Sequence, residues 1–340
     1  MFRTLMVSYA NIGSKINSNV SPVCLECSIA RKRNYNANDQ TRSISSKSYC
    51  MDLVKRRDYE HYLTTLLLPD KIRRMGFALR ALNVEISSIR DNVSEEAIGK
   101  MRLQFWKDSI NDIYNKKHLD DRQEPLKIPN HPVVIELHQC LLKHPNISLE
   151  LLNRMISSRE VFLSNHQPFQ SMEEVSKYSE NTFSSINNIL LESLIDSQNG
   201  NELHGHAKHC ANQLGKAEGI VTLLRALPYN ASQNRVYLPL SLLVSHKIST
   251  ESIIRGLGGD ELRHVIEVIA AVAEENLENS RFRKKYLSVE EKRIMLTAVS
   301  VDSYLSKLAK VNCDVFDKFL QRKDSWLPFK LYTHKWKRSY

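Results

Sequence analysis

An apolar stripe in the second half of the chain constrains the fold more than any other feature. Between His206 and Leu224, apolar residues recur at steps of three and four, which is the spacing of one face of an α-helix. The stripe consists of Ala207, Cys210, Ala211, Leu214, Ala217, Val221 and Leu224. Gly215 and Gly219 lie on the same segment, and each costs about 1 kcal/mol relative to alanine in a helix. We therefore predict a core helix that another helix approaches closely at these two glycines.

The rest of the body also reads as helices. From Tyr49 onward, helical patterns alternate with short interruptions that contain Pro, Asn or Gly, and no internal repeat is present. The 340 residues include only ten glycines and ten prolines, too few for the many tight turns of a β-sandwich. Three sites carry helix-start signals: Ser171 with Glu174, Ser288 with Glu291, and Pro69. These patterns predict an all-α fold with a single helical domain at residues 49–320.

The net charge of +10 is concentrated at the two ends of the chain. Residues 1–48 hold seven Lys or Arg against two acids, residues 318–340 hold seven against one, and the remainder is nearly neutral. A protein that binds nucleic acid needs its excess of cations on the folded surface that follows the phosphates. We therefore expect no nucleic-acid partner.

Residues 1–48 have the composition of a mitochondrial presequence. The apolar residues of the leading stretch stand at near-helical spacing: Phe2, Leu5, Met6, Tyr9 and Ile12. Arg3 and Lys15 are its charges, and no continuous apolar segment of a secretory signal occurs. This composition predicts import into the mitochondrial matrix, and the alternative is a basic tail without a targeting role.

Residues 321–340 form a basic, aromatic tail. Lysines and an arginine alternate with large apolar residues: Trp326, Leu327, Phe329, Leu331, Tyr332 and Trp336. Trp and Tyr favour the headgroup level of a bilayer, and each Lys or Arg near anionic lipid adds about 1 kcal/mol of attraction. The tail predicts peripheral association with the inner membrane, although the aromatic residues could instead cover the helical body. No stretch of the body reaches the roughly 18 to 20 apolar residues of a membrane-spanning helix.

Two groups of side chains have the residue types of metal ligands. Asp108 and Asp112 are one helical turn apart, where two carboxylates can share a divalent cation. The second group has the residue types that bind zinc: His204, His206, His209 and Cys210. A solvated helix face explains the aspartates equally well, and core packing explains Cys210, so we expect neither a metal nor a cofactor. The six cysteines are widely spaced, which favours a reducing compartment.

Residues 215–239 carry a family signal. They read GKAEGIVTLLRALPYNASQNRVYLP, a helical segment followed by a loop and the sequence Arg-Val-Tyr-Leu-Pro. This order resembles the second signature of the squalene and phytoene synthases, which condense prenyl diphosphates. Residues 49–69, Phe77–Ala81 and Met101–Trp106 resemble helices from the first part of these enzymes. The resemblance covers about residues 49–320 and implies the all-helical bundle of the isoprenoid synthases.

The chemistry of that family needs acids that this chain does not have at the matching positions. Ionising an allylic diphosphate requires Mg²⁺, and aspartates one helical turn apart on two facing helices hold these ions. The second signature has Ala226, Tyr229 and Asn230 where family members carry acids, and the first signature offers only Glu85. We therefore expect no catalytic residues and no metal site.

The resemblance nevertheless implies a vestigial pocket. Arg225, Arg235 and Tyr237 match the family at the mouth of this pocket, where packing or capping explains each of them as well as binding does. The other members of the vestigial pocket are Glu85, Ala226, Tyr229 and Asn230.

Several short segments together resemble one mitochondrial branch of the family, whose members help to assemble respiratory complex I: Asn83–Glu85, Gln104–Trp106, Arg225–Tyr229, Leu327–Tyr332 and Trp336–Tyr340. The resemblance implies a non-enzymatic scaffold or chaperone in the matrix, peripheral to the inner membrane. It would act early in the biogenesis of a membrane-arm subunit, with complex I subunits or assembly intermediates as partners.

Two alternatives to this function stay open. One is an active prenyl-diphosphate transferase with an unconventional metal site, and the other is an apolar cavity that binds an isoprenoid or lipid without reaction.

Overall fold

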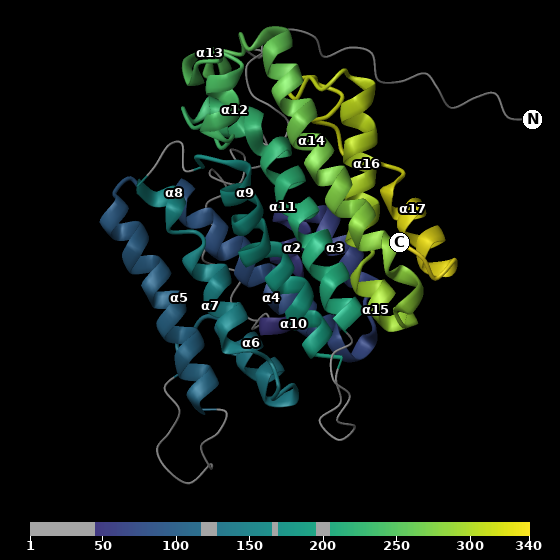
Figure 1. The fold of residues 1–340 in the computed structure, drawn as a ribbon. Coiled ribbons are helices and arrows are strands. Elements are labelled where there is room, and N and C mark those ends of the chain that lie inside the picture. The colour runs from purple at the N-terminus through teal and green to yellow at the C-terminus, as the bar shows by residue number, and fades with distance from the viewer. Residues whose placement is uncertain (1–44, 117–127, 165–168, 195–204) are drawn as a thin grey trace, which may run out of the picture. The chain divides into compact units, whose positions relative to one another are not determined.

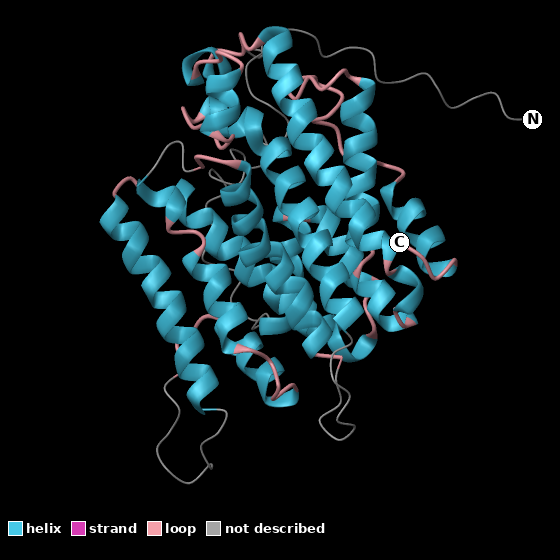
Figure 2. Ribbon diagram, viewed as in Figure 1, coloured by secondary structure: helices cyan, strands magenta, loops and turns pink. Residues whose placement is uncertain are grey.

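The computed structural model describes residues 45–116, 128–164, 169–194 and 205–340. Within these ranges every regular element is a helix, as Figure 2 shows, which confirms the prediction of an all-α fold. The segment interpreted as a presequence lies outside the described residues, apart from its last four. The domain boundaries at residues 49 and 320 stay predictions.

Helices follow one another along the described chain (Figure 1). The first half contains α2 (Ser46–Arg57), α3 (Tyr59–Leu66), α4 (Asp70–Ser88), the 3₁₀ turn η1 (Ile89–Asn92), α5 (Glu96–Lys116), α6 (Pro132–Lys143), α7 (Leu149–Ser157), α8 (Val161–Ser164), α9 (Met172–Ser179), the π-helical turn η2 (Glu180–Ser184) and α10 (Ser185–Glu192). The second half contains α11 (Gly205–Ser232), α12 (Leu240–Ser245), α13 (Thr250–Ile254), α14 (Gly259–Phe282), the 3₁₀ turn η3 (Lys284–Tyr286), α15 (Val289–Ile294), α16 (Thr297–Lys310) and α17 (Leu327–Trp336).

The predicted core helix is α11, the longest helix described. It is 28 residues long, and α9, η2, α10, α14 and α16 all pack against it. Every residue of the apolar stripe is buried, from Ala207 to Leu224. Because burial of apolar surface contributes about 25 cal/mol per Å², the buried stripe helps to hold α11 in the core.

Gly215 and Gly219 allow the close approach that the sequence predicts. A Cβ atom at Gly215 would lie 2.3 Å from the backbone nitrogen of Ser184, and one at Gly219 would lie 2.3 Å from the Cβ of Ser179. Ser179 is the last residue of α9, and Ser184 is the last residue of the π-helical turn η2, which continues α9 without a break. We call these two elements the α9–η2 segment. A side chain at either glycine would therefore force the two helices apart.

In the first half of the chain, α2, α4 and α6 pack against one another. Helix α4 is the most deeply buried of the three and includes the fully covered side chains of Ile72, Leu79 and Leu82. Helix α5 lies along the outer side of this half, at the left of Figure 1, and contacts α6, α7 and α8. The arrangement leaves α5 with one face toward the core and another toward solvent.

The helix-start signals are confirmed, although only one forms the full capping box. Ser288 and Glu291 bond each other's backbone amides at the start of α15. Helix α9 does begin after Ser171, but the Ser171 side chain does not cap it, and Glu174 instead accepts a hydrogen bond of 2.6 Å from the amide of Gln170. Pro69 occupies the N-cap position of α4.

The C-terminal tail is partly packed and partly exposed. Leu327 and Leu331 on one side of α17 are buried against α3 and α16, and the Tyr340 hydroxyl donates a hydrogen bond of 3.1 Å to the carbonyl of Ser280. The opposite side presents Trp326, Phe329, Tyr332 and Trp336, each more than 60% exposed. One face of α17 therefore covers the body, and membrane contact through the exposed face stays a prediction.

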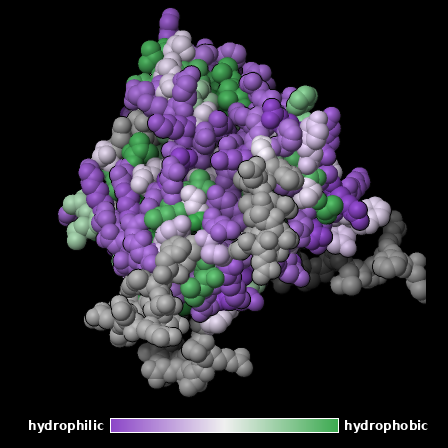
Figure 3. Space-filling model, turned by 60° about the horizontal axis from the view of Figure 1, so that its bottom comes forward, coloured by the Kyte–Doolittle hydropathy of each residue, from purple (hydrophilic) through white to green (hydrophobic). Residues whose placement is uncertain are grey.

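The face shown in Figure 3 is mostly hydrophilic, with separate small hydrophobic groups. None of the helices in the described ranges combines the length and the apolar character that crossing a bilayer requires.

Candidate functional site

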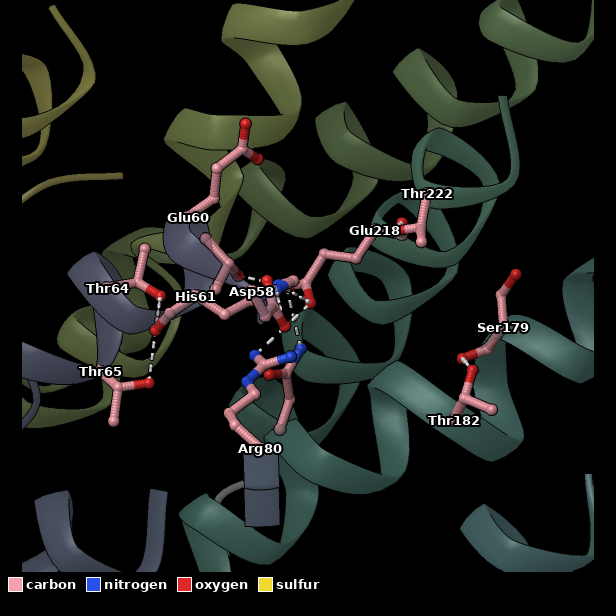
Figure 4. Close-up of polar contacts among 12 residues, drawn as sticks. Asp58, Glu60, His61, Thr64, Thr65, Arg80, Ser179, Thr182, Glu218 and Thr222 are labelled. Carbon is pink, nitrogen blue, oxygen red and sulfur yellow. Dashed lines mark hydrogen bonds and ion pairs between the residues drawn. The ribbon is translucent and has the colours of Figure 1, made fainter. Parts of the chain in front are cut away.

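Four charged side chains meet in the interior where α3, α4 and α11 converge. Asp58 precedes α3, His61 lies on α3, Arg80 on α4 and Glu218 on α11, and Figure 4 shows them pointing toward one another. His61 is 7% exposed, Arg80 2% and Glu218 1%. We call these four residues the buried charge cluster.

The cluster forms a chain of opposite charges. His61 Nδ1 lies 2.8 Å from Asp58 Oδ1, while His61 Nε2 lies 3.7 Å from Glu218 Oε2. Arg80 Nη2 approaches the same Glu218 oxygen at 3.8 Å. The last two distances exceed a hydrogen bond, so Glu218 interacts with both cations mainly through their charge.

Neutral donors satisfy the other oxygen of Glu218. Glu218 Oε1 accepts a hydrogen bond of 3.3 Å from the Asn187 amide of α10 and a second from the Thr297 hydroxyl of α16. Both donors are buried. The carboxylate therefore ties α11 to α3, α4, α10 and α16 at one point.

The charges in the cluster favour the ionised forms of Asp58, His61 and Glu218. Burial alone would raise the pKa of Asp58, but protonated His61 outweighs it and lowers this pKa to about 2. Burial and Arg80 disfavour protonation of His61, but Asp58 and Glu218 prevail and raise its pKa. Burial also opposes ionisation of Glu218, and His61 and Arg80 overcome it and lower the pKa of that carboxyl. Two cations thus face two carboxylates.

The pairing of these charges determines whether the cluster can bind a metal ion. A buried carboxylate is stable only when partners compensate its charge, and here cations and donors of the chain itself provide that compensation. Within the residues that the structure describes, no three His, Cys, Asp or Glu side chains are grouped so that they could hold a metal ion. The arrangement is suited to locking five helices together.

Arg225 and Ala226, predicted for the vestigial pocket, lie near this cluster on α11. Arg225 forms an ion pair with Glu60 of α3, and this pair raises the pKa of the guanidinium, with a smaller contribution from Asp58. Ala226 is half-buried, as is Tyr229 one turn later. Arg225 thus fastens the end of α11 to α3.

Asn230, Arg235 and Tyr237 lie at the end of α11 and just after it. Asn230 is buried, and its carbonyl accepts hydrogen bonds from the amides of Gln233 and Arg235 where α11 ends. Arg235 Nη1 lies 2.7 Å from Asp91 in η1, which connects the two signature regions. The Tyr237 ring is buried against Phe162, with ring centroids 4.5 Å apart.

Glu85 lies in a third place. It is half-buried on α4, accepts a hydrogen bond of 3.2 Å from the Tyr49 hydroxyl, and lines a groove beside α5. Arg235 contacts Asp91 of η1, and η1 continues α4 beyond Glu85.

Among the described residues, the side chains considered as metal ligands do not form a group of three that could hold an ion. Asp108 and Asp112 are exposed on α5, where Asp108 accepts a hydrogen bond from Gln104. Cys210 is fully buried in the core, and His206 stacks on Tyr286 with ring centroids 4.3 Å apart. His204 lies outside the described residues.

The buried charge cluster was not predicted from the sequence. A charged residue inside an apolar helical segment could have indicated such a cluster. When the helix is buried, the charge of this residue needs a partner. Arg80 stands between Leu79 and Ala81, and Glu218 stands next to Gly219 on the core helix. The sequence did not indicate which residues pair, since the partners are far apart along the chain.

Comparison with known proteins gives a consistent family assignment. The squalene/phytoene synthase family matches residues 54–329. The chain is 37% identical to "NADH dehydrogenase (ubiquinone) complex I, assembly factor 6" of Bos taurus over 92% of this chain and 88% of that one. The Homo sapiens protein of the same name is 38% identical over 86% of this chain and 82% of that one. A dehydrosqualene synthase crystal structure superimposes with a TM-score of 0.70 at 17% identity, covering 86% of this chain and 95% of that one.

Proposed function

Since this chain belongs to the squalene/phytoene synthase family, we propose that it uses the helical body of that family to assist the assembly of mitochondrial respiratory complex I, and not to make isoprenoids. The observation that carries this proposal is the similarity to complex I assembly factor 6 of mammals, which extends over more than four fifths of both chains. The likeness to the dehydrosqualene synthase supports the fold alone.

The interior supports a non-enzymatic role, that of a pseudoenzyme. The second signature has Ala226, Tyr229 and Asn230 at the positions that the resemblance assigns to acids. The oxygens of Glu218 are already paired with cations and donors of the chain. Mg²⁺-assisted departure of a diphosphate requires several oxygen ligands that are free to bind the ions. We therefore propose a scaffold or chaperone without a cofactor.

A surface of exposed aromatic rings and cations supports peripheral association with the inner membrane. Helix α17 presents Phe329, Tyr332 and Trp336, and the last residue of α14 is Phe282, which is 82% exposed. The Tyr340–Ser280 hydrogen bond brings the two segments together. Exposed cations follow both segments: Lys284, Lys285, Lys337 and Arg338. Such a surface suits an anionic bilayer better than bulk water.

The proposed location is the matrix face of the inner membrane. The composition of residues 1–48 supports import by a cleaved transit peptide, and the nearly neutral body offers no excess of cations for nucleic acid. At this face the chain would act early, when a subunit of the membrane arm is made or stabilised, on complex I subunits or assembly intermediates.

Deletion of the protein in cells tests the assembly role. We expect native gels to show loss of complex I with the other respiratory complexes retained, and restoration when the full chain is expressed again. Normal complex I in the deleted cells would contradict the proposal.

An activity measurement tests the enzymatic alternative. The full chain is incubated with Mg²⁺ and farnesyl or geranylgeranyl diphosphate, and released diphosphate is measured. We expect no release above that of a heat-denatured sample. Turnover by the folded chain would show that an unconventional metal site operates.

A further inference from the structure

A groove of about 480 Å³ lies between α4, η1 and α5, apart from the buried charge cluster. Residues from Glu85 to Asn92 line one side and residues from Ile98 to Trp106 line the other, and His131 also contributes to the lining. We propose that this groove is the docking site for an amphipathic helix of a partner protein that carries a Lys or Arg. The inference rests on the proposed assembly role, because it assigns the surface that would hold the client.

The α5 side of the groove carries exposed apolar side chains. Ile98 is 39% exposed, Met101 72% and Phe105 42%. They occupy positions i, i+3 and i+7 of one helix, so they form a ladder of about 10 Å along its axis. An apolar ladder of this spacing fits the side of a second helix, and a flexible methionine adapts to different partner side chains.

The α4 side of the groove provides a carboxylate that lacks a cation. Glu85 accepts a hydrogen bond from Tyr49, and none of the described Lys or Arg side chains forms an ion pair with it. His131 does not neutralise it, because burial lowers the pKa of this imidazole and favours its neutral form. A guest cation would therefore meet an unpaired negative charge here.

Aromatic rings around Glu85 add to the attraction for a cation. Trp106 and His131 meet edge to face, with ring centroids 4.9 Å apart. Tyr49 also meets the His131 ring edge to face, with ring centroids 6.3 Å apart. Ring faces and a carboxylate together favour a Lys or Arg that is partly removed from water. This charge complementarity selects a basic guest.

Arg102 gives the groove a direction. Arg102 lies on α5, and its guanidinium donates a weak hydrogen bond of 3.4 Å across the groove to the carbonyl of Asn92, which is on the same side as Glu85 and seven residues beyond it. Seven residues correspond to about 10 Å of helix, the same length as the apolar ladder. A guest helix with a cation at one end and an acid two turns away would match both charges, whereas a compact lipid headgroup would match only one end.

Site-specific crosslinking in mitochondria tests the proposal. A benzophenone amino acid is placed at Met101 of the full chain, expressed in cells that lack the natural copy, and the products of illumination are identified by mass spectrometry. We expect a protein adduct whose crosslinked segment is helical, apolar on one face and contains Lys or Arg. In the same chain, Glu85→Lys should reduce the adduct about tenfold or more, and Glu85→Gln should reduce it less.

Functional rescue provides the second measurement. Met101→Glu with Phe105→Ser should leave the melting temperature nearly unchanged, because both side chains are exposed, but should restore at most a small part of complex I. Leu257→Ser and Glu275→Gln are matched controls on other surfaces, where Leu257 is 70% exposed, and should restore complex I as the wild type does.

Two results would overturn the docking inference while leaving the assembly role intact. One is full restoration of complex I by the folded groove variants. The other is a Met101 probe that labels only lipid or no molecule at all. Absence of a complex I defect in the deleted cells would instead contradict the assembly role itself, so the two failures are distinguishable.

Discussion

Glu218 is the residue at which the interactions of the interior converge. It faces His61 and Arg80 with one oxygen and accepts hydrogen bonds from Asn187 and Thr297 with the other. Removing one member of such a buried pair leaves an uncompensated charge and costs about 3 to 5 kcal/mol, whereas removing both charges costs less. The cluster therefore behaves as a unit.

Substitution of the Arg80–Glu218 pair tests this coupling. We expect Arg80→Met and Glu218→Gln each to lower the free energy of unfolding by about 3 kcal/mol. The double variant should lose clearly less than the sum, with an interaction free energy of at least about 1 kcal/mol. Denaturant unfolding measures all four chains, and strict additivity would show that the two charges do not stabilise each other.

The stability that His61 contributes should depend on pH. Because the pKa of His61 is raised in the folded protein, its contribution is complete below the unfolded value of 6.5 and is lost as pH rises through the folded pKa. The pKa of Asp58 is lowered to about 2, so its contribution is complete above its unfolded value of 3.8 and is lost as pH falls toward 2.

Melting temperatures of the wild type and His61→Gln from pH 5 to pH 9 check this expectation. The difference should be largest below pH 6.5 and should shrink at higher pH. His264→Gln, an exposed histidine on α14, serves as a control and should show little difference at any pH. A gap between the wild type and His61→Gln that stays constant over the range would contradict protonation of His61 in the folded state.

At the scale of helices, two glycines set the distance between α11 and the α9–η2 segment. We expect Gly219→Ala to destabilise the protein by about 1 to 3 kcal/mol, because the added methyl group overlaps Ser179 and the helices must separate. Gly205→Ala is the matched control, since a Cβ there meets nothing within 4 Å. Thermal unfolding should show a lower melting temperature for the first variant alone, and equal melting temperatures would exclude the close contact.

The same helices show what the sequence can and cannot predict. The period of three and four residues predicts α11 and its buried face, and the glycines predict the close contact, because both signals are local. The sequence does not indicate that Glu218 meets His61 and Arg80, since their pairing depends on how α3, α4 and α11 pack. The Ser171 signal likewise predicts where α9 begins, but Glu174 bonds Gln170 and not the expected amide.

At the scale of the whole molecule, the excess positive charge lies at the ends and the folded body is nearly neutral. The exposed aromatic face of α17 then adds to the attraction of its cations for anionic lipid. Binding through exposed cations weakens as salt rises, because ions screen charges over about 10 Å at 0.1 M. We therefore expect salt to weaken binding to vesicles without abolishing the contribution of the aromatic rings.

Vesicle flotation with the full chain tests the tail. Replacing Lys337 and Arg338 by Gln removes about 2 kcal/mol of attraction, which corresponds to about thirtyfold weaker binding to vesicles with anionic lipid. Lys143→Gln with Lys247→Gln removes the same charge from other exposed positions and should bind almost as the wild type does. Equal loss in both variants would mean that net charge, and not this surface, determines binding.

Because the charges of the buried cluster compensate one another, the folded protein does not depend on a ligand for its stability. A protein whose pocket is completed by a bound ion or substrate becomes more stable as the ligand concentration rises, so its lifetime follows metabolism. Here the side chains of the cluster compensate one another without any ligand. We therefore expect the amount of folded protein to be insensitive to swings in magnesium and prenyl-diphosphate supply, and to depend on synthesis and proteolysis alone.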